Sequence, residues 1–131
     1  MKQVESYRDL AVWRKAIDLT VHCYEASSTF PKSEIFGLAG QMRRAAVSIG
    51  ANIAEGRGRR YTGDFIRFIS NAYGSLAELE THVIVAKRLS YIDDGEANEL
   101  LYCAGEIGRM LNGFLKTLKR KGQKDAPSYD G

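Results

Sequence analysis

The sequence predicts an all-α protein, a single antiparallel four-helix bundle of up-down-up-down topology over residues 1–118. Apolar residues recur at steps of three and four in four separate segments, which is the period of an amphipathic helix. Glycine, proline and aspartate mark the boundaries between these segments. Nowhere do apolar and polar residues alternate with the period of a strand. Because short connections make consecutive helices lie antiparallel, a bundle is expected.

The spacing of apolar residues and the residues at the boundaries predict the first two helices. The first is expected over about residues 8–27, with a stripe of Leu10, Trp13, Ile17, Val21 and Tyr24. The second is expected to begin near Ser33, a plausible N-cap after Phe30-Pro31, and to end in the turn of residues 56–58. Its apolar face carries Ile35, Leu38, Met42, Ala45, Ile49 and Ile53.

The third helix, about residues 62–88, has the most regular pattern in the chain. Thr62 is a good N-cap, and Asp64 suits the positive first turn. Its apolar residues form a heptad seam: Phe65, Ile69, Ala72, Leu76, Leu79, Val83 and Ala86. The expected core of the whole bundle contains Ile17, Leu38, Ile49, Ile69, Leu76, Leu79, Leu111 and Leu115.

The fourth helix is expected from about Ala97 to Leu118, after the turn of residues 93–95. Residues 119–131 are basic and polar, so a disordered tail is expected there. Four glycines lie inside the third and fourth helices: Gly74, Gly105, Gly108 and Gly113. Each either allows a close approach of two helices or is merely tolerated.

Several classes of protein are excluded by composition and motifs. The 131-residue chain has two cysteines, Cys23 and Cys103, without paired-cysteine spacing, which predicts reduced thiols and no zinc site. No apolar run reaches the ~18 residues of a membrane span, and no signal-peptide pattern opens the chain. We therefore expect a cytoplasmic protein that does not contact the membrane.

Catalytic and metal-binding patterns are also missing. A di-iron bundle needs Glu-x-x-His pairs, and none occurs. Glu78 and His82 are four residues apart and are expected to pair along one helix face. His22 offers no partner and points away from Cys23 around the helix, which argues against a cysteine nucleophile. We expect no enzyme, no cofactor and no metal site.

The most informative segment runs from Arg43 to Arg60. From Arg43 to Arg67 there are six arginines against two carboxylates, a local charge of +4 compared with +3 for the whole chain. Arg57, Arg59 and Arg60 crowd a glycine-rich turn before the third helix, where free backbone N–H groups favour an anion. Arginine binds phosphate with two nitrogens at once, and Tyr61 is placed to stack on an unpaired base. The alternative is a solvated turn without a ligand.

A second basic cluster follows near the C-terminus: Lys116, Lys119, Arg120, Lys121 and Lys124. In an up-down bundle the fourth helix ends beside the turn between the second and third helices, so the two clusters are expected to converge. The segment from Glu78 to Glu106 has a charge of −5 and is expected at the opposite pole. Such a dipole suits nucleic-acid binding or the pairing of unlike subunit surfaces.

Three segments carry a resemblance to a known family: residues 7–13 (YRDLAVW), 41–56 (QMRRAAVSIGANIAEG) and 74–82 (GSLAELETH). Together they resemble the four-helix bundle proteins encoded in intervening sequences of bacterial 23S ribosomal RNA genes. The resemblance covers about residues 6–118. Residues 106–111 and 119–121 are also similar to the accessory variability protein of diversity-generating retroelements.

The resemblance implies a ring-like homopentamer, a basic surface for RNA or DNA and no catalytic residues. In the retroelement relative it also implies contact with a reverse transcriptase. Two functions follow as alternatives. One is a non-catalytic nucleic-acid-binding scaffold with weak sequence preference, and the other is an interaction module that recruits a protein such as a reverse transcriptase. A neighbouring reverse transcriptase gene, or a position inside a ribosomal RNA gene, would distinguish them.

Overall fold

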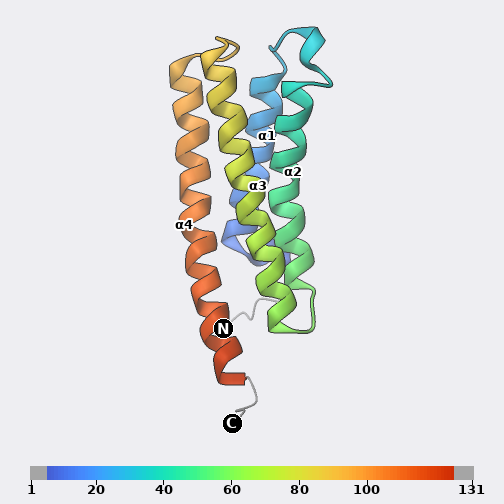
Figure 1. Ribbon diagram of the computed structural model, residues 1–131, viewed down its shortest axis with the longest axis vertical. Helices are drawn as coiled ribbons and strands as arrows, with labels where there is room; N and C mark the ends of the chain where they lie inside the picture. Colours follow the sequence, from blue (N-terminus) through green and yellow to red (C-terminus); the bar gives the residue numbers. More distant parts are fainter. Residues whose placement is uncertain (1–5, 126–131) are drawn as a thin grey trace, which may run out of the picture.

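The structure is a computed structural model that describes residues 6–125. Four α-helices are joined by short connections: α1 (Ala11–Ser27), α2 (Leu38–Arg57), α3 (Thr62–Arg88) and α4 (Asp94–Asp125). Two 3-10 helices, η1 (Tyr7–Asp9) and η2 (Lys32–Glu34), precede α1 and α2. Figure 1 shows the α1–α2 and α3–α4 connections at one end and the α2–α3 turn at the other. The described residues contain no strand, which confirms an all-α fold of four helices.

Helix α1 buries a different face from the predicted one. Ile17, expected in the core, is 37% exposed, and Val21 and Tyr24 are exposed as well. The buried face consists of Val12, Ala16, Leu19, Cys23 and Ala26. The prediction was wrong because it followed the largest apolar side chains. The distance between two packed helices depends on the side chains at their contact, and small ones allow the closer approach.

Helix α2 begins at Leu38, later than predicted. Ser33 lies in η2, and Ile35 and Phe36 are exposed in the connection that follows. A Cβ at Gly40 would lie 2.7 Å from the carbonyl oxygen of Ile35. The connection therefore passes directly over the first turn of α2, where only glycine leaves room for it.

The heptad seam predicted for α3 is buried from Ile69 to Ala86, and Phe65 at its start is half-buried. The expected core residues that prove to be buried are Ile49, Ile69, Leu76, Leu79 and Leu111. Leu38 and Leu115 are half-buried and pack against this core. No helix within residues 6–125 is long and apolar enough to cross a membrane.

The connection between α3 and α4 is a Schellman motif with a non-glycine residue in the left-handed position. Ser90 has a φ of 61°, and the N–H of Tyr91 donates to the carbonyl of Ala86 at 2.9 Å. The Asp93 carboxylate then caps α4 by accepting a hydrogen bond from the N–H of Glu96 at 2.8 Å. These bonds make the reversal between the two longest helices compact.

Helix α4 continues to Asp125, so residues 119–125 are helical and the disordered tail predicted for them is wrong. Leu118 is only 8% exposed and belongs to the core. A Cβ at Gly122 would lie 3.7 Å from Cγ2 of Thr62, so the contact between α4 and α3 continues past the expected end. Residues 126–131 of the predicted tail lie outside the described residues.

The glycines inside the helices are of two kinds. A Cβ at Gly108 would lie 3.2 Å from Cδ2 of Leu76, so this glycine allows α4 to approach α3. A Cβ at Gly74 or Gly113 would meet nothing within 4 Å. Both alternatives of the sequence analysis therefore occur, at different positions.

Candidate nucleic-acid interface

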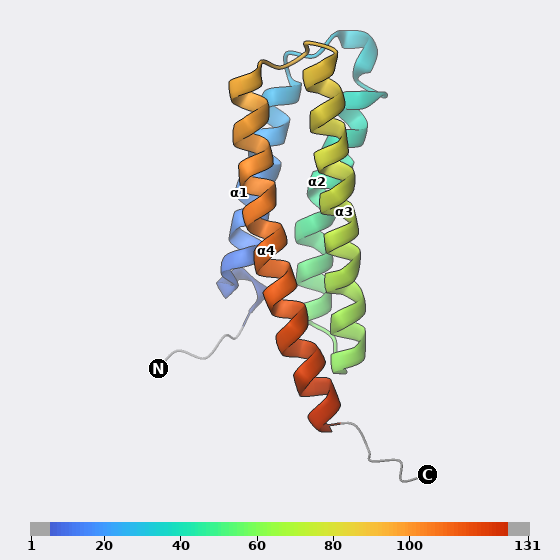
Figure 2. The same cartoon turned by 60° about the vertical axis from the view of Figure 1, so that its left-hand side comes forward.

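One end of the molecule collects the predicted basic residues. The α2–α3 turn and the last turns of α4 lie at the same end in both views (Figures 1 and 2). The rings of Phe65 and Phe114 join them, with centroids 5.3 Å apart, and Gly122 lies beside Thr62. The two clusters therefore converge as expected. We call this surface the basic end and define it by Arg57, Arg59, Arg60, Tyr61, Lys116, Lys119, Arg120 and Lys121.

Gly56 sets the distance between α2 and α3 at the basic end. A Cβ at this position would lie 2.8 Å from Cβ of Phe68 and 3.0 Å from Cδ1 of Phe65. The chain then turns tightly, and the N–H of Arg59 donates to the carbonyl of Gly56 at 3.1 Å. The arginines are thus carried on a short turn whose two flanking helices are in direct contact.

The arginines of the turn differ in their surroundings. The guanidinium carbon of Arg59 lies 4.6 Å from the centroid of the Phe68 ring, and that of Arg67 lies 5.0 Å from the same ring. A cation over an aromatic face is attracted by the ring quadrupole, which gives Arg59 a preferred direction. Arg59 and Arg60 are exposed, and Arg57 is half-buried. The side chains of Arg59 and Arg60 therefore lie at the surface of the turn.

Tyr61 is the N-cap residue of α3, but its side chain forms no capping hydrogen bond. Its backbone carbonyl accepts a hydrogen bond from the N–H of Phe65 at 3.2 Å. The ring is 66% exposed, with the Arg60 guanidinium carbon 5.9 Å from its centroid. The start of α3 thus depends on the backbone of Tyr61 and leaves the ring at the surface.

Helix α4 adds a second group of cations, all of them exposed: Lys116, Lys119, Arg120 and Lys121. Successive helical residues are about 100° apart, so Lys119 and Lys121 flank the face of α4 that carries the buried Leu118 and Gly122. Gly122 lies beside Thr62 of α3. Lys124 also belongs to α4, but its side chain lies outside the described residues.

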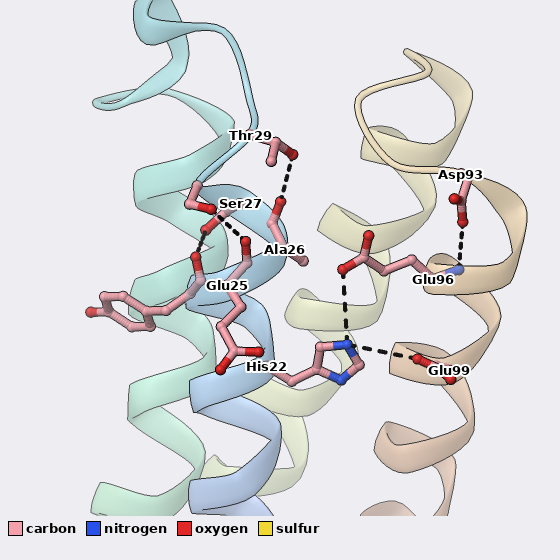
Figure 3. Close-up of polar contacts among 10 residues, drawn as sticks. His22, Glu25, Ala26, Ser27, Thr29, Asp93, Glu96 and Glu99 are labelled. Atoms are coloured by element: carbon pink, nitrogen blue, oxygen red, sulfur yellow. Dashed lines mark hydrogen bonds and ion pairs between the residues drawn. The ribbon is translucent and has the colours of Figure 1, made fainter.

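Carboxylates gather toward the other end, where α4 begins. His22 of α1 projects between two of them, as Figure 3 shows, with Nε2 3.9 Å from Oε1 of Glu96 and 3.9 Å from Oε2 of Glu99. These two contacts of His22 were not predicted from the sequence. Lower on the same two helices, a hydrogen bond from Lys15 to Glu106 raises the pKa of the lysine. Sequence reasoning missed both contacts because nothing in the chain gives the relative height of α1 and α4.

The remaining candidates for chemistry are the cysteines, histidines and carboxylates of the described residues. No group of three or more His, Cys, Asp or Glu among them could hold a metal ion. Burial raises the pKa of the Cys23 thiol to about 12, which leaves almost no thiolate at neutral pH. Nε2 of His82 lies 3.4 Å from Oε1 of Glu78 along one face of α3, the pairing that the sequence predicted.

Fold and surface together define a class of protein: a four-helix, all-α protein with cations at one end and carboxylates toward the other. The chain belongs to the 23S rRNA-intervening sequence protein family, whose profile matches residues 8–113. This confirms the predicted family, whereas the similarity to the retroelement accessory protein stays a prediction.

One solved relative is a protein of unknown function from the S23 ribosomal protein family of Bacteroides thetaiotaomicron. It is 25% identical, with a TM-score of 0.74, and the similarity covers 81% of this chain and 99% of that one. No curated protein matches the chain.

Proposed function

We propose that the protein is a non-catalytic, cytoplasmic scaffold that binds RNA or DNA at the basic end with weak sequence preference. The observation that supports this most directly is the convergence of the α2–α3 turn and the end of α4, segments far apart in the sequence. If the arginines of the turn were merely solvated, there would be no reason to expect a second group of cations at the same end of the bundle. Two groups of cations at one end of the bundle suit a phosphate backbone, which carries a negative charge at every nucleotide.

The proposed contacts are electrostatic and made to phosphates. Phosphate contacts position a nucleic acid without reading its bases, which accounts for weak sequence preference. Each phosphate that a cation neutralises releases a counterion, so affinity falls linearly with salt on a logarithmic scale. The number of contacts therefore sets the slope of that dependence.

Changing Arg57, Arg59 and Arg60 together to alanine is expected to weaken binding and to flatten the salt dependence. If each arginine contacts one phosphate, the slope of log K against log salt should fall by roughly 2 to 3. Fluorescence anisotropy with labelled RNA and single-stranded DNA at several salt concentrations measures both quantities. Circular dichroism checks that the variant remains helical.

A control variant removes three exposed cations elsewhere: Lys32, Arg44 and Arg88. It changes the net charge by the same amount and should keep most of the slope. Equal losses in the two variants would mean that only net charge matters. If the triple alanine variant of the turn binds like the parent at every salt concentration, the basic end is only a solvated surface and the proposal is wrong.

We further infer that the antiparallel up-down-up-down bundle assembles into a ring-like homopentamer. Beside the family resemblance, two unlike surfaces on opposite sides of the bundle support this, the first apolar and the second a groove lined by both polar and apolar residues. One follows α1 and α2 and includes Trp13, Ile17, Val21, Tyr24 and Val47. The other is a groove of about 160 Å³ between α3 and α4, lined by Tyr73, Ala77 and Gly108 together with the polar residues Glu80, Arg109 and Asn112. Unlike surfaces that meet head to tail generate a ring when the rotation between neighbouring subunits closes, and an open filament when it does not.

Light scattering is expected to give a mass of five 14.6-kDa chains, about 73 kDa. Val21→Glu should dissociate the assembly because it places a charge on the α1–α2 surface, where Val21 is 52% exposed. Leu89→Glu is the control, since Leu89 is 51% exposed at the end of α3, outside both surfaces. A monomeric parent at micromolar concentration would contradict the ring.

Recruitment of a protein such as a reverse transcriptase is the second candidate. One observation favours it: Phe36 is 91% exposed and Ile35 is 54% exposed, both on the α1–α2 connection, away from the basic end. Large exposed apolar side chains are typical anchors of protein interfaces. If the triple alanine variant of Arg57, Arg59 and Arg60 binds nucleic acid like the parent, the result favours protein recruitment over nucleic-acid binding.

A further inference from the structure

We propose that the basic end prefers single-stranded to double-stranded nucleic acid because Tyr61 stacks on an unpaired base. The inference rests on the proposed function and specifies its substrate class. The observation behind it is that two aromatic rings at the basic end differ in how much of each ring is exposed. Phe68 is 8% exposed, with Arg59 and Arg67 over it, whereas Tyr61 is 66% exposed.

The fold makes little use of the Tyr61 ring. The side chain forms no capping hydrogen bond, and the backbone carbonyl alone accepts the bond that begins α3. A single exposed aromatic residue is ordinary on a protein surface. Here, however, the ring directly follows Arg59 and Arg60, and consecutive Cα atoms are only about 3.8 Å apart. A phosphate held by these arginines therefore brings its own base, or the adjacent one, within reach of the ring.

The geometry at the ring selects for unpaired bases. Arg60 lies over the ring at 5.9 Å from the centroid, and the large exposed area leaves room for a flat ligand beside it. In a duplex both faces of each internal base are covered by its neighbours, so stacking on a protein ring requires an unpaired base. Every base has such a face, which keeps the contact tolerant of sequence. The phosphate contacts alone are common to single strands and duplexes.

The test compares three probes: an oligothymidylate, an abasic oligonucleotide of equal length and a duplex of equal length. Tyr61→Ala is expected to weaken binding of the oligothymidylate by roughly 5- to 150-fold, the value of one stacked base. Binding of the abasic strand and of the duplex should not change, because both rely on phosphates alone. Tyr61→Phe keeps the ring and should bind all three probes like the parent.

Tyr102→Ala is the matched control, since Tyr102 is 69% exposed on α4 and is not part of the basic end. It should leave all three affinities unchanged. A Tyr61→Ala variant that binds the oligothymidylate like the parent would overturn the inference. An equal loss on the abasic strand would do so too, because the ring would then be acting on the shape of the turn. If Tyr61→Phe lowered the affinity for the oligothymidylate as much as Tyr61→Ala, the Tyr61 hydroxyl and not the ring would make the contact, which would also overturn the inference.

These outcomes are separable from a failure of the proposed function. If the parent binds none of the three probes, the nucleic-acid proposal and the single-strand preference both fall. If the parent binds strands and duplex alike with a steep salt dependence, and Tyr61→Ala does not differ from it, only the stacking inference falls. Circular dichroism of each variant confirms that the helices are intact.

Discussion

Replacing Leu76 with alanine is expected to lower the free energy of unfolding by about 2–5 kcal/mol. Leu76 is 3% exposed in the seam of α3, and its Cδ2 atom faces Gly108 of α4. The variant loses apolar burial and leaves a cavity that its neighbours fill only in part. Urea denaturation followed by circular dichroism, at one protein concentration, measures the loss.

Leu89→Ala provides the control for this prediction because Leu89 is 51% exposed at the end of α3. A surface substitution of this kind should change stability by no more than about 0.5 kcal/mol. Equal effects at Leu76 and Leu89 would show that Leu76 does not lie in a packed core. A large loss at Leu76 alone supports the seam as the centre of the molecule.

Gly56→Ala is expected to destabilise the protein by about 1–3 kcal/mol, although alanine favours helices. The new Cβ would lie 2.8 Å from Cβ of Phe68, an atom fixed by the backbone of α3. The two helices must therefore separate at the basic end, and Arg59 would lose its position over the Phe68 ring. Thermal denaturation should show the loss, and nucleic-acid binding should weaken with it.

Gly113→Ala makes the matched comparison, since a Cβ at this position of α4 would meet nothing within 4 Å. This variant is expected to gain about 0.5–1 kcal/mol from helix propensity alone. Opposite signs for the two substitutions are the signature of close packing at Gly56. A Gly56→Ala variant more stable than the parent would mean that α2 and α3 are further apart at this end.

How much of the fold could be predicted depended on how regular each apolar stripe is. The seam of α3 has one uninterrupted heptad pattern, so only one face was possible, and it is the buried one. Helix α1 has two candidate faces, and the larger side chains of Ile17 and Val21 drew the prediction to the wrong one. Which face of a helix is buried depends on the width of the gap between its neighbours, and a local pattern carries no information about that width.

At the candidate site, too, features within one segment could be predicted from the sequence, and contacts between segments could not. The crowding of Arg57, Arg59 and Arg60 in one turn is a property of the sequence and was visible there. The cation–aromatic contact of Arg59 with Phe68 was not visible, because it joins residues on two sides of the turn. The helical continuation of α4 past Leu118 was hidden by its charged residues, which resemble a solvated tail when read without α3 beside them.

The sequence by itself determined the four helices, the heptad core of α3, the basic turn and the family. All of these depend on residues within a few turns of one another, where spacing and composition act directly. Only the tertiary structure decided that the face with Ala16, Leu19 and Cys23 is the inner face of α1. It also decided that His22 lies between Glu96 and Glu99 and that Gly122 lies beside Thr62. These features arise where separate helices meet, and the relative rotation and height of two helices are fixed by packing, which no single segment encodes.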